Sequence, residues 1–179
     1  MDDRDEKPKV KVLRKITKVR LKNIALYYVQ RFETSTENLR QVLCRRINDY
    51  ARQNKEFDKE EAYGWAEEVL SEFQGYKYLD DSRFAEIKIR DYLAAGKSER
   101  YIRGKMTEKG IADDIVEAVL AEQEFDPFEN AMRLAKKKRI GPYRPEEERA
   151  AFRQKDMGTL ARAGFELDVV KRVLDENCV

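Results

Sequence analysis

Residues 79–120 contain three short amphipathic runs, and this stretch limits the possible folds of the chain more than any other. Asp80–Asp81 stand before the first run, which is typical of a helix N-terminus. Ser98 opens the second run, and Gly110 follows it where many helices end in a left-handed glycine. The third run begins after Asp113–Asp114. Helices this short are unstable alone in water, so the three must share one hydrophobic core.

A related pattern returns near the C-terminus, which indicates that the chain is built from repeats. Residues 110–116 read GIADDIV and residues 164–170 read GFELDVV, and a valine–leucine pair follows each at the same spacing. Trp65–Ala66 and Val69–Leu70 have this spacing as well. A repeat of roughly 50 residues buries little surface alone and is expected to stack on its neighbours. The sequence therefore predicts an all-α protein of three tandem three-helix repeats stacked into an elongated curved array.

The predicted repeats differ in length because their linkers differ. We place a basic flexible N-terminal arm at residues 1–16, the first repeat at 17–73, the second at 74–123 and the third at 124–179. An array of this kind presents a long concave surface. Such a surface suits a protein that binds an extended partner better than it suits an enzyme with a pocket.

Helix start signals lie on both sides of the central stretch. Thr17 stands before the first amphipathic run, and Thr34 has the spacing of a capping box with the glutamate three residues later. Asp58 has the same spacing with a following glutamate, and Asp126 stands before a proline in the first helical turn. We expect the last helix over residues 167–177.

The residue types argue against catalysis. The chain has no histidine, which removes the usual general base near neutral pH and the commonest neutral metal ligand. We assign Asp80–Asp81 to helix capping rather than metal binding, and we expect Cys44 and Cys178 to be two reduced thiols. Gly96–Lys97–Ser98 resembles the end of a phosphate-binding loop, but Asp91 stands where the first glycine is required. We therefore expect no enzyme activity, no cofactor and no catalytic, cofactor-binding or metal-binding residue.

The composition is that of a folded, soluble protein. Charged residues make up 40% of the 179 residues and hydrophobic residues 41%. No apolar run approaches the ~20 residues of a membrane span. The N-terminus lacks the apolar segment of a signal peptide. We expect a cytoplasmic protein that does not bind membranes, and a monomer, because three stacked repeats can bury a core without a second chain.

Basic residues gather in three places: residues 7–22, the arginines of the first repeat between residues 31 and 46, and residues 133–144. Residues 7–22 hold eight lysines and arginines and no acidic residue, and residues 133–144 also lack an acid. Such a run is either a solvated face or a contact with nucleic acid or an acidic protein surface. The candidate contacts with a partner or DNA are Arg31, Arg40, Arg45, Arg46, Lys136, Lys137, Lys138, Arg139 and Arg144.

Several motifs occur in a fixed order along the chain: Leu79–Ala85 (LDDSRFA), Lys109–Ile111 and Ala163–Phe165. Together they resemble the RecX family, bacterial regulatory proteins that modulate the recombinase RecA. Residues 26–35, with an arginine before a Ser-capped helix, are similar to the family's first repeat, and the resemblance covers about residues 17–174. One departure is Lys97–Ser98, which stands where many relatives have Gly–Pro, although serine can still cap the helix.

The resemblance implies an all-α protein of three tandem three-helix repeats that binds in the groove of a RecA–single-stranded-DNA filament. It would bridge neighbouring protomers and restrain strand exchange, ATP hydrolysis and co-protease activity without a catalytic group. The implied partners are the RecA filament, single-stranded DNA and double-stranded DNA. A binder shifts a filament only by its difference in affinity for the filament's conformations.

A second interpretation is a protein that binds DNA directly through its basic arm and residues 136–139. The net charge of +2 argues against DNA affinity as the sole function, because a dedicated DNA-binding protein is usually more basic. A third interpretation, an enzyme, is disfavoured by the residue types above.

Overall fold

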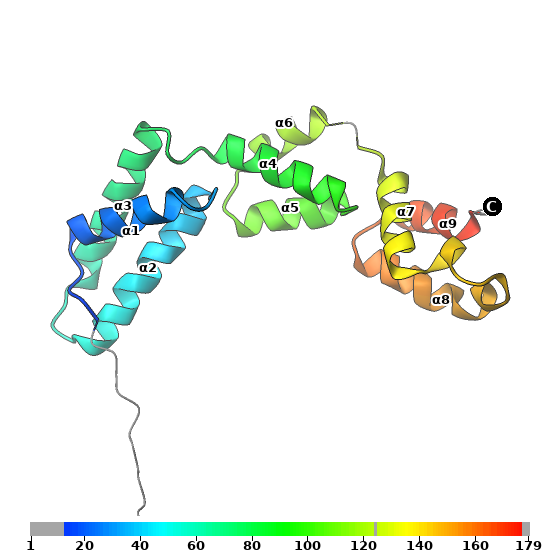
Figure 1. Cartoon of the computed structure of the whole chain (residues 1–179), viewed down its shortest axis with the longest axis horizontal. Helices are drawn as coiled ribbons and strands as arrows, with labels where there is room; N and C mark the ends of the chain where they lie inside the picture. Colours follow the sequence, from blue (N-terminus) through cyan, green and yellow to red (C-terminus); the bar gives the residue numbers. More distant parts are fainter. Residues whose placement is uncertain (1–12, 124, 177–179) are drawn as a thin grey trace, which may run out of the picture. The chain divides into compact units, whose positions relative to one another are not determined.

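The computed structural model describes residues 13–123 and 125–176, and within them the chain is entirely helical apart from its connections (Figure 1). It has nine α-helices and one 3₁₀ helix in this part, and no strand. The all-α fold predicted from the sequence is confirmed. In chain order the helices are α1 (Lys18–Val29), α2 (Thr36–Gln53), α3 (Lys59–Gly75), α4 (Asp81–Ala94), α5 (Glu99–Glu108), α6 (Asp113–Ala121), α7 (Pro127–Lys138), η1 (Gly141–Tyr143), α8 (Glu146–Arg162) and α9 (Leu167–Asp175).

The chain divides into two compact units, and the first ends at Leu79. In this first unit, α1, α2 and α3 pack around one core. Leu21, Leu43 and Phe73 are fully buried there, one from each helix. Ile16, from the segment before α1, and Leu79, after α3, also lie in this core. The end of the predicted basic arm therefore packs against the first unit, while residues 1–12 lie outside the described residues.

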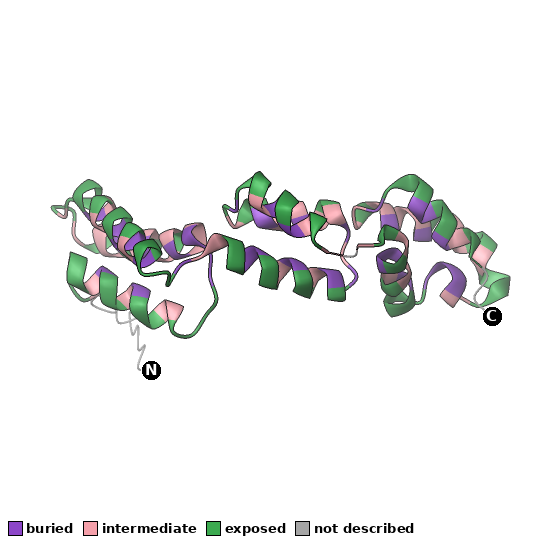
Figure 2. Ribbon diagram, turned by 90° about the horizontal axis from the view of Figure 1, so that it is seen from above, coloured by how far each residue is buried: buried purple, intermediate pink, exposed green. Residues whose placement is uncertain are grey.

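The second unit begins at Asp80 and contains two cores. Helices α4, α5 and α6 enclose one core, which includes Ile89, Ile102 and Val116. Helices α7, α8 and α9 enclose the other, which includes Leu160 and Val170. Figure 2 shows that the buried residues run along parts of the helices and alternate with exposed ones, as amphipathic helices require.

Two copies of the predicted repeat share the same local structure, a left-handed glycine followed by a short helix. Gly110 and Gly164 both adopt left-handed backbone angles, with φ of 68° and 94°. Each precedes a nine-residue helix, α6 or α9. Helix α6 buries Val116 and Val119, and α9 buries the corresponding Val170 and Val173 as well as Val169. The division at residues 17, 74 and 124 and the stacking into one curved array remain predictions.

The helix starts agree with the sequence in most places. Thr17, Asp58, Asp80 and Asp126 each accept a hydrogen bond from a backbone N–H of the first turn. The prediction of a capping box that starts at Thr34 is wrong, because Thr34 is not the N-cap of α2.

The N-cap of α2 is Ser35, whose hydroxyl accepts from the Asn38 N–H at 3.2 Å. Thr34 instead accepts from the Asn38 side chain. The last helix ends at Asp175, and residue 177, the end of the predicted range, lies outside the described residues.

Hydrogen bonds connect the two three-helix groups of the second unit. The Ser98 hydroxyl donates to the Ala163 carbonyl at 2.7 Å, across 65 residues of sequence. Asn130, buried on α7, donates from its amide to the Lys97 carbonyl at 3.1 Å. A Cβ added to Gly164 would lie 2.6 Å from the Ser98 hydroxyl oxygen, so this approach requires glycine.

Candidate interaction surfaces

Four consecutive cations end α7, and we call Lys136, Lys137, Lys138 and Arg139 the α7 cluster. Helix α7 begins with Asp126 as its cap and a proline at its first position, and it buries Ala131 and Ala135. Arg139 adopts the left-handed conformation, with φ 52° and ψ 51°. In this turn the N–H of Ile140 donates to the carbonyl of Ala135 at 3.0 Å. Arg139 thus occupies the position that glycine usually takes at a helix end.

The α7 cluster has an intrinsic stabilising effect on its helix. The carbonyls at a helix C-terminus carry partial negative charge, and lysines in the last turn interact favourably with it. All four side chains are exposed, and none forms an ion pair with any residue that the structure describes. Their charges therefore remain available to a partner.

Arg144, predicted as part of the same basic stretch, has a different environment. Its guanidinium donates to both carboxylate oxygens of Asp156, at 3.0 and 2.9 Å, and its side chain is 17% exposed. Asp156 is 2% exposed and also accepts from the Gly141 N–H at 2.9 Å. Arg144 thus fixes the connection between α7 and α8, and its charge is compensated within the fold.

The arginines predicted on the first unit also fall into two groups. Arg40 donates to both carboxylate oxygens of Glu67, at 2.7 and 3.0 Å, and also pairs with Glu37. The hydrogen bonds to Glu67 raise the pKa of Arg40 above its ordinary value. Arg45 and Arg46 are exposed and make no ion pair among the described residues. The guanidinium of Arg31 lies over the Tyr27 ring, 4.0 Å from its centroid.

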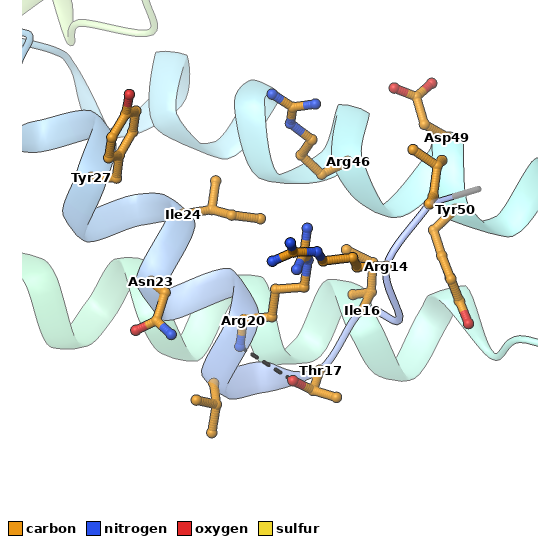
Figure 3. Close-up of a pocket in the computed structure, with 12 residues that line it drawn as sticks. Arg14, Ile16, Thr17, Arg20, Asn23, Ile24, Tyr27, Arg46, Asp49 and Tyr50 are labelled. Carbon is orange, nitrogen blue, oxygen red and sulfur yellow. Dashed lines mark hydrogen bonds between the residues drawn. The ribbon is translucent and has the colours of Figure 1, made fainter. Parts of the chain in front are cut away.

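A pocket of about 800 Å³ on the first unit is lined by Arg46 and by two arginines that we did not single out from the sequence. Arg14 comes from the segment before α1 and Arg20 from the first turns of α1 (Figure 3). Both belong to the basic run at residues 7–22, which signals the charge but not the position. Only folding brings this run beside Arg46 of α2.

The described residues contain no candidate metal-binding site and no reactive cysteine. Within residues 13–123 and 125–176, no group of three or more potential metal ligands is close enough to hold an ion. Cys44 is a half-buried free thiol, and burial raises its pKa, so it stays protonated and a poor nucleophile near neutral pH. Cys178 lies outside the described residues. In the same described part, every helix falls short of the length and apolarity that a membrane crossing demands.

Comparisons with known proteins agree with this architecture. The family model described as "RecX, second three-helix domain" matches residues 80–120, which form α4 to α6. Regulatory protein RecX of Myxococcus xanthus is 33% identical over 167 residues, covering 92% of this chain and 89% of that protein. Regulatory protein RecX of Agrobacterium fabrum is 33% identical over 162 residues, covering 86% and 80%.

A solved structure supports the fold independently. The crystal structure of a regulatory protein RecX has a TM-score of 0.63 at 22% identity and covers 89% of this chain and 72% of that chain. The relatives form a family of regulatory proteins rather than a known class of enzyme. The sequence identity over nearly the whole chain and the shared helical fold lead to one conclusion: the chain belongs to the RecX family of regulatory proteins.

Proposed function

We propose that this protein binds the RecA–single-stranded-DNA filament and restrains its strand exchange, ATP hydrolysis and co-protease activity. Membership of the RecX family carries the proposal, because the family resemblance implies this partner. The protein would act as a non-catalytic, cytoplasmic binder. Its effect on the filament would arise from preferential binding to one filament conformation.

Cations without carboxylate partners among the described residues lie on both compact units, and this supports a protein that binds an extended partner. The first unit presents Arg31, Arg45 and Arg46, and the second presents the α7 cluster. None of these cations has a carboxylate partner among the described residues. Cations on two separate compact units can contact more than one protomer of a repetitive filament, and linked contacts bind more tightly than either alone. We leave Arg40 and Arg144 out of the proposed contact surface because carboxylates within the fold already bind them.

The second candidate is direct DNA binding by the α7 cluster and the basic arm. The unpaired charges of the α7 cluster favour it, while the net charge of +2 disfavours DNA affinity as the sole function. Residues 1–12 of the arm lie outside the described residues.

The deciding experiment measures single-strand-dependent ATP hydrolysis by RecA with this protein titrated in, beside binding of the protein alone to the same DNA. The proposal expects hydrolysis to fall at protein concentrations too low to coat the free DNA. Unchanged hydrolysis together with tight, salt-sensitive DNA binding would instead favour the second candidate.

Replacing Lys136, Lys137 and Lys138 together by glutamine is expected to raise the concentration needed for half-inhibition about tenfold. Each charge at the rim of an interface contributes on the order of 0.5 kcal/mol, and three such losses amount to about one decade in affinity. The ATP-hydrolysis titration measures the shift. Inhibition equal to that of the unmodified protein would remove the lysines from the contact surface.

Two further variants separate contact from folding and from net charge. Arg139→Gly removes a charge of the α7 cluster but places glycine in a left-handed turn, so the fold should become more stable while inhibition weakens. A triple variant at the exposed residues Lys55, Lys59 and Lys171, each replaced by glutamine, removes the same charge elsewhere. We expect it to inhibit like the unmodified protein.

A further inference from the structure

The pocket lined by Arg14, Arg20 and Arg46 is a concentration of positive charge without a matching acid. The one acidic side chain in its lining, Asp49, already accepts a hydrogen bond from Arg52 at 3.2 Å. None of the three lining arginines makes an ion pair within the described part of the chain. Like charges gathered in one place repel one another, and a bound anion relieves that repulsion.

The fold fixes the backbone at Arg14 and Arg20. Arg14 lies between Leu13, whose N–H donates to the Gln53 side chain at 3.3 Å, and the segment that places Ile16 in the core. Arg20 lies in the turn that Thr17 caps. Figure 3 shows Arg14 from the segment before α1, Arg20 on α1 and Arg46 on the neighbouring helix α2, and all three line the pocket.

One donor of this group lacks an acceptor. The Nε of Arg20 is buried, and no residue that the structure describes accepts its hydrogen. Buried donors are normally satisfied, because an unpaired one loses its hydrogen bond to water and gains nothing in return. An oxyanion in the pocket would supply the missing acceptor once the Arg20 side chain turns its Nε toward it.

The rest of the lining indicates which oxyanion fits. Guanidinium groups bind phosphate through paired hydrogen bonds. Ile24 and the rings of Tyr27 and Tyr50 line the same pocket, and Tyr27 is 56% exposed. Cations next to exposed aromatic rings are typical of sites for single-stranded nucleic acid, where the bases are free to stack. A free anion or an acidic side chain would use the arginines but would have no need for Tyr27.

We propose that Arg14, Arg20 and Arg46 bind a phosphate of single-stranded nucleic acid, and that an adjacent base stacks on the face of the Tyr27 ring that Arg31 does not cover. This inference deepens the proposed function by giving the protein its own contact with the single strand of the filament. The contact does not require the recombinase, so it is measurable with the protein alone.

The test is fluorescence anisotropy of a labelled 15-nucleotide oligothymidylate titrated with the full chain at several salt concentrations. Replacing Arg14, Arg20 and Arg46 by glutamine should weaken binding roughly tenfold or more, and the salt slope should fall by about 0.7 for each phosphate that the variant no longer neutralises. Tyr27→Leu should weaken binding roughly fivefold because the base loses its stacking partner. Arg20→Lys, which keeps the charge but removes the Nε donor, should also weaken it.

Matched controls decide whether the pocket itself is responsible. The variant with Lys15, Lys55 and Lys59 replaced by glutamine removes the same charge from exposed positions of the first unit that do not line the pocket. Equal weakening by this variant would overturn the inference, since net charge alone would then explain binding. Circular dichroism melting confirms that each variant is folded.

Competition identifies the source of the phosphate. Inorganic pyrophosphate that binds as tightly as the oligonucleotide, with the same arginine dependence but no effect of Tyr27→Leu, would overturn the nucleic-acid assignment in favour of a free anion. Polyglutamate binding of equal strength would overturn it in favour of an acidic peptide. If the arginine variants bind DNA normally while the protein still inhibits RecA, this inference fails and the proposed function stands.

Discussion

Replacing Gly164 by alanine is expected to lower the free energy of unfolding of the second unit by about 3 kcal/mol. Gly164 has φ of 94°, where a side chain strains the backbone by roughly 1–2 kcal/mol. The new Cβ would lie 2.6 Å from the Ser98 hydroxyl, which caps α5 and donates to Ala163. Moving that hydroxyl aside sacrifices the cap, at a further cost of about 1 kcal/mol.

Urea unfolding followed by two probes tests this expectation. The only tryptophan of the chain, Trp65, belongs to the first unit, whereas circular dichroism follows the helices of both units. Gly164→Ala should move the circular dichroism transition to lower urea and leave the fluorescence midpoint in place. An equal shift of both signals would contradict the assignment of this contact to the second unit.

Two comparison variants isolate the contact between Gly164 and Ser98. Gly104→Ala makes the same substitution inside α5, where no atom lies within 4 Å of the new Cβ, and it should stabilise the helix. Ser98→Ala should destabilise on its own by removing the cap. The double variant Ser98→Ala/Gly164→Ala should lose less unfolding free energy than the sum of the two single losses. Without the Ser98 hydroxyl, the new Cβ at position 164 no longer clashes with it.

Asp156→Asn is expected to lower the free energy of unfolding by about 3 kcal/mol near neutral pH. The Asp156 carboxylate is 2% exposed and accepts hydrogen bonds from Gly141 and twice from Arg144. An asparagine keeps the shape but loses the charge, and its amide nitrogen cannot accept a hydrogen bond. Urea unfolding of the two proteins measures the difference.

The pH dependence of this difference follows from the pKa of Asp156. Burial raises that pKa, but the hydrogen bonds from Arg144 and Gly141 lower it by more, so it lies below the ordinary value of 3.8. The folded state therefore binds a proton less readily than the unfolded state. The stabilisation is complete above about pH 5 and is lost as the pH falls through the pKa of the folded protein, where the two proteins should converge.

An exposed ion pair on the same helix provides the control. Arg153 of α8 pairs with Asp175 at 2.7 Å, but the Asp175 side chain is 63% exposed. Water screens such a pair, so Asp175→Asn should change stability by less than about 1 kcal/mol. A cost as large as that of Asp156→Asn would show that burial is not what makes the Asp156 pair important.

The sequence predicts which basic residues belong to the candidate surfaces, but it does not predict how they are arranged in space. The lysines of the α7 cluster follow directly from four consecutive basic residues at a helix end. Arg14 and Arg20 lie in a basic run that is visible in the sequence, yet nothing in that run indicates a pocket. The pocket exists because Ile16 enters the core and thereby brings the run against α2.

The sequence by itself determined the helices, most of their caps and the family, because these depend on residues close together in the chain. Thr17, Asp58 and Ser98 each cap a helix through a backbone N–H two or three residues later. Only the tertiary structure decided which cations remain available to a partner.

In the sequence, Arg144 and Arg40 are as plausible contact residues as Lys138 and Arg46. In the structure, Arg144 is bound by Asp156 and Arg40 by Glu67. These partners lie 12 and 27 residues away. A pairing across that distance depends on how the helices pack, since packing decides both which charges meet and how much water remains between them.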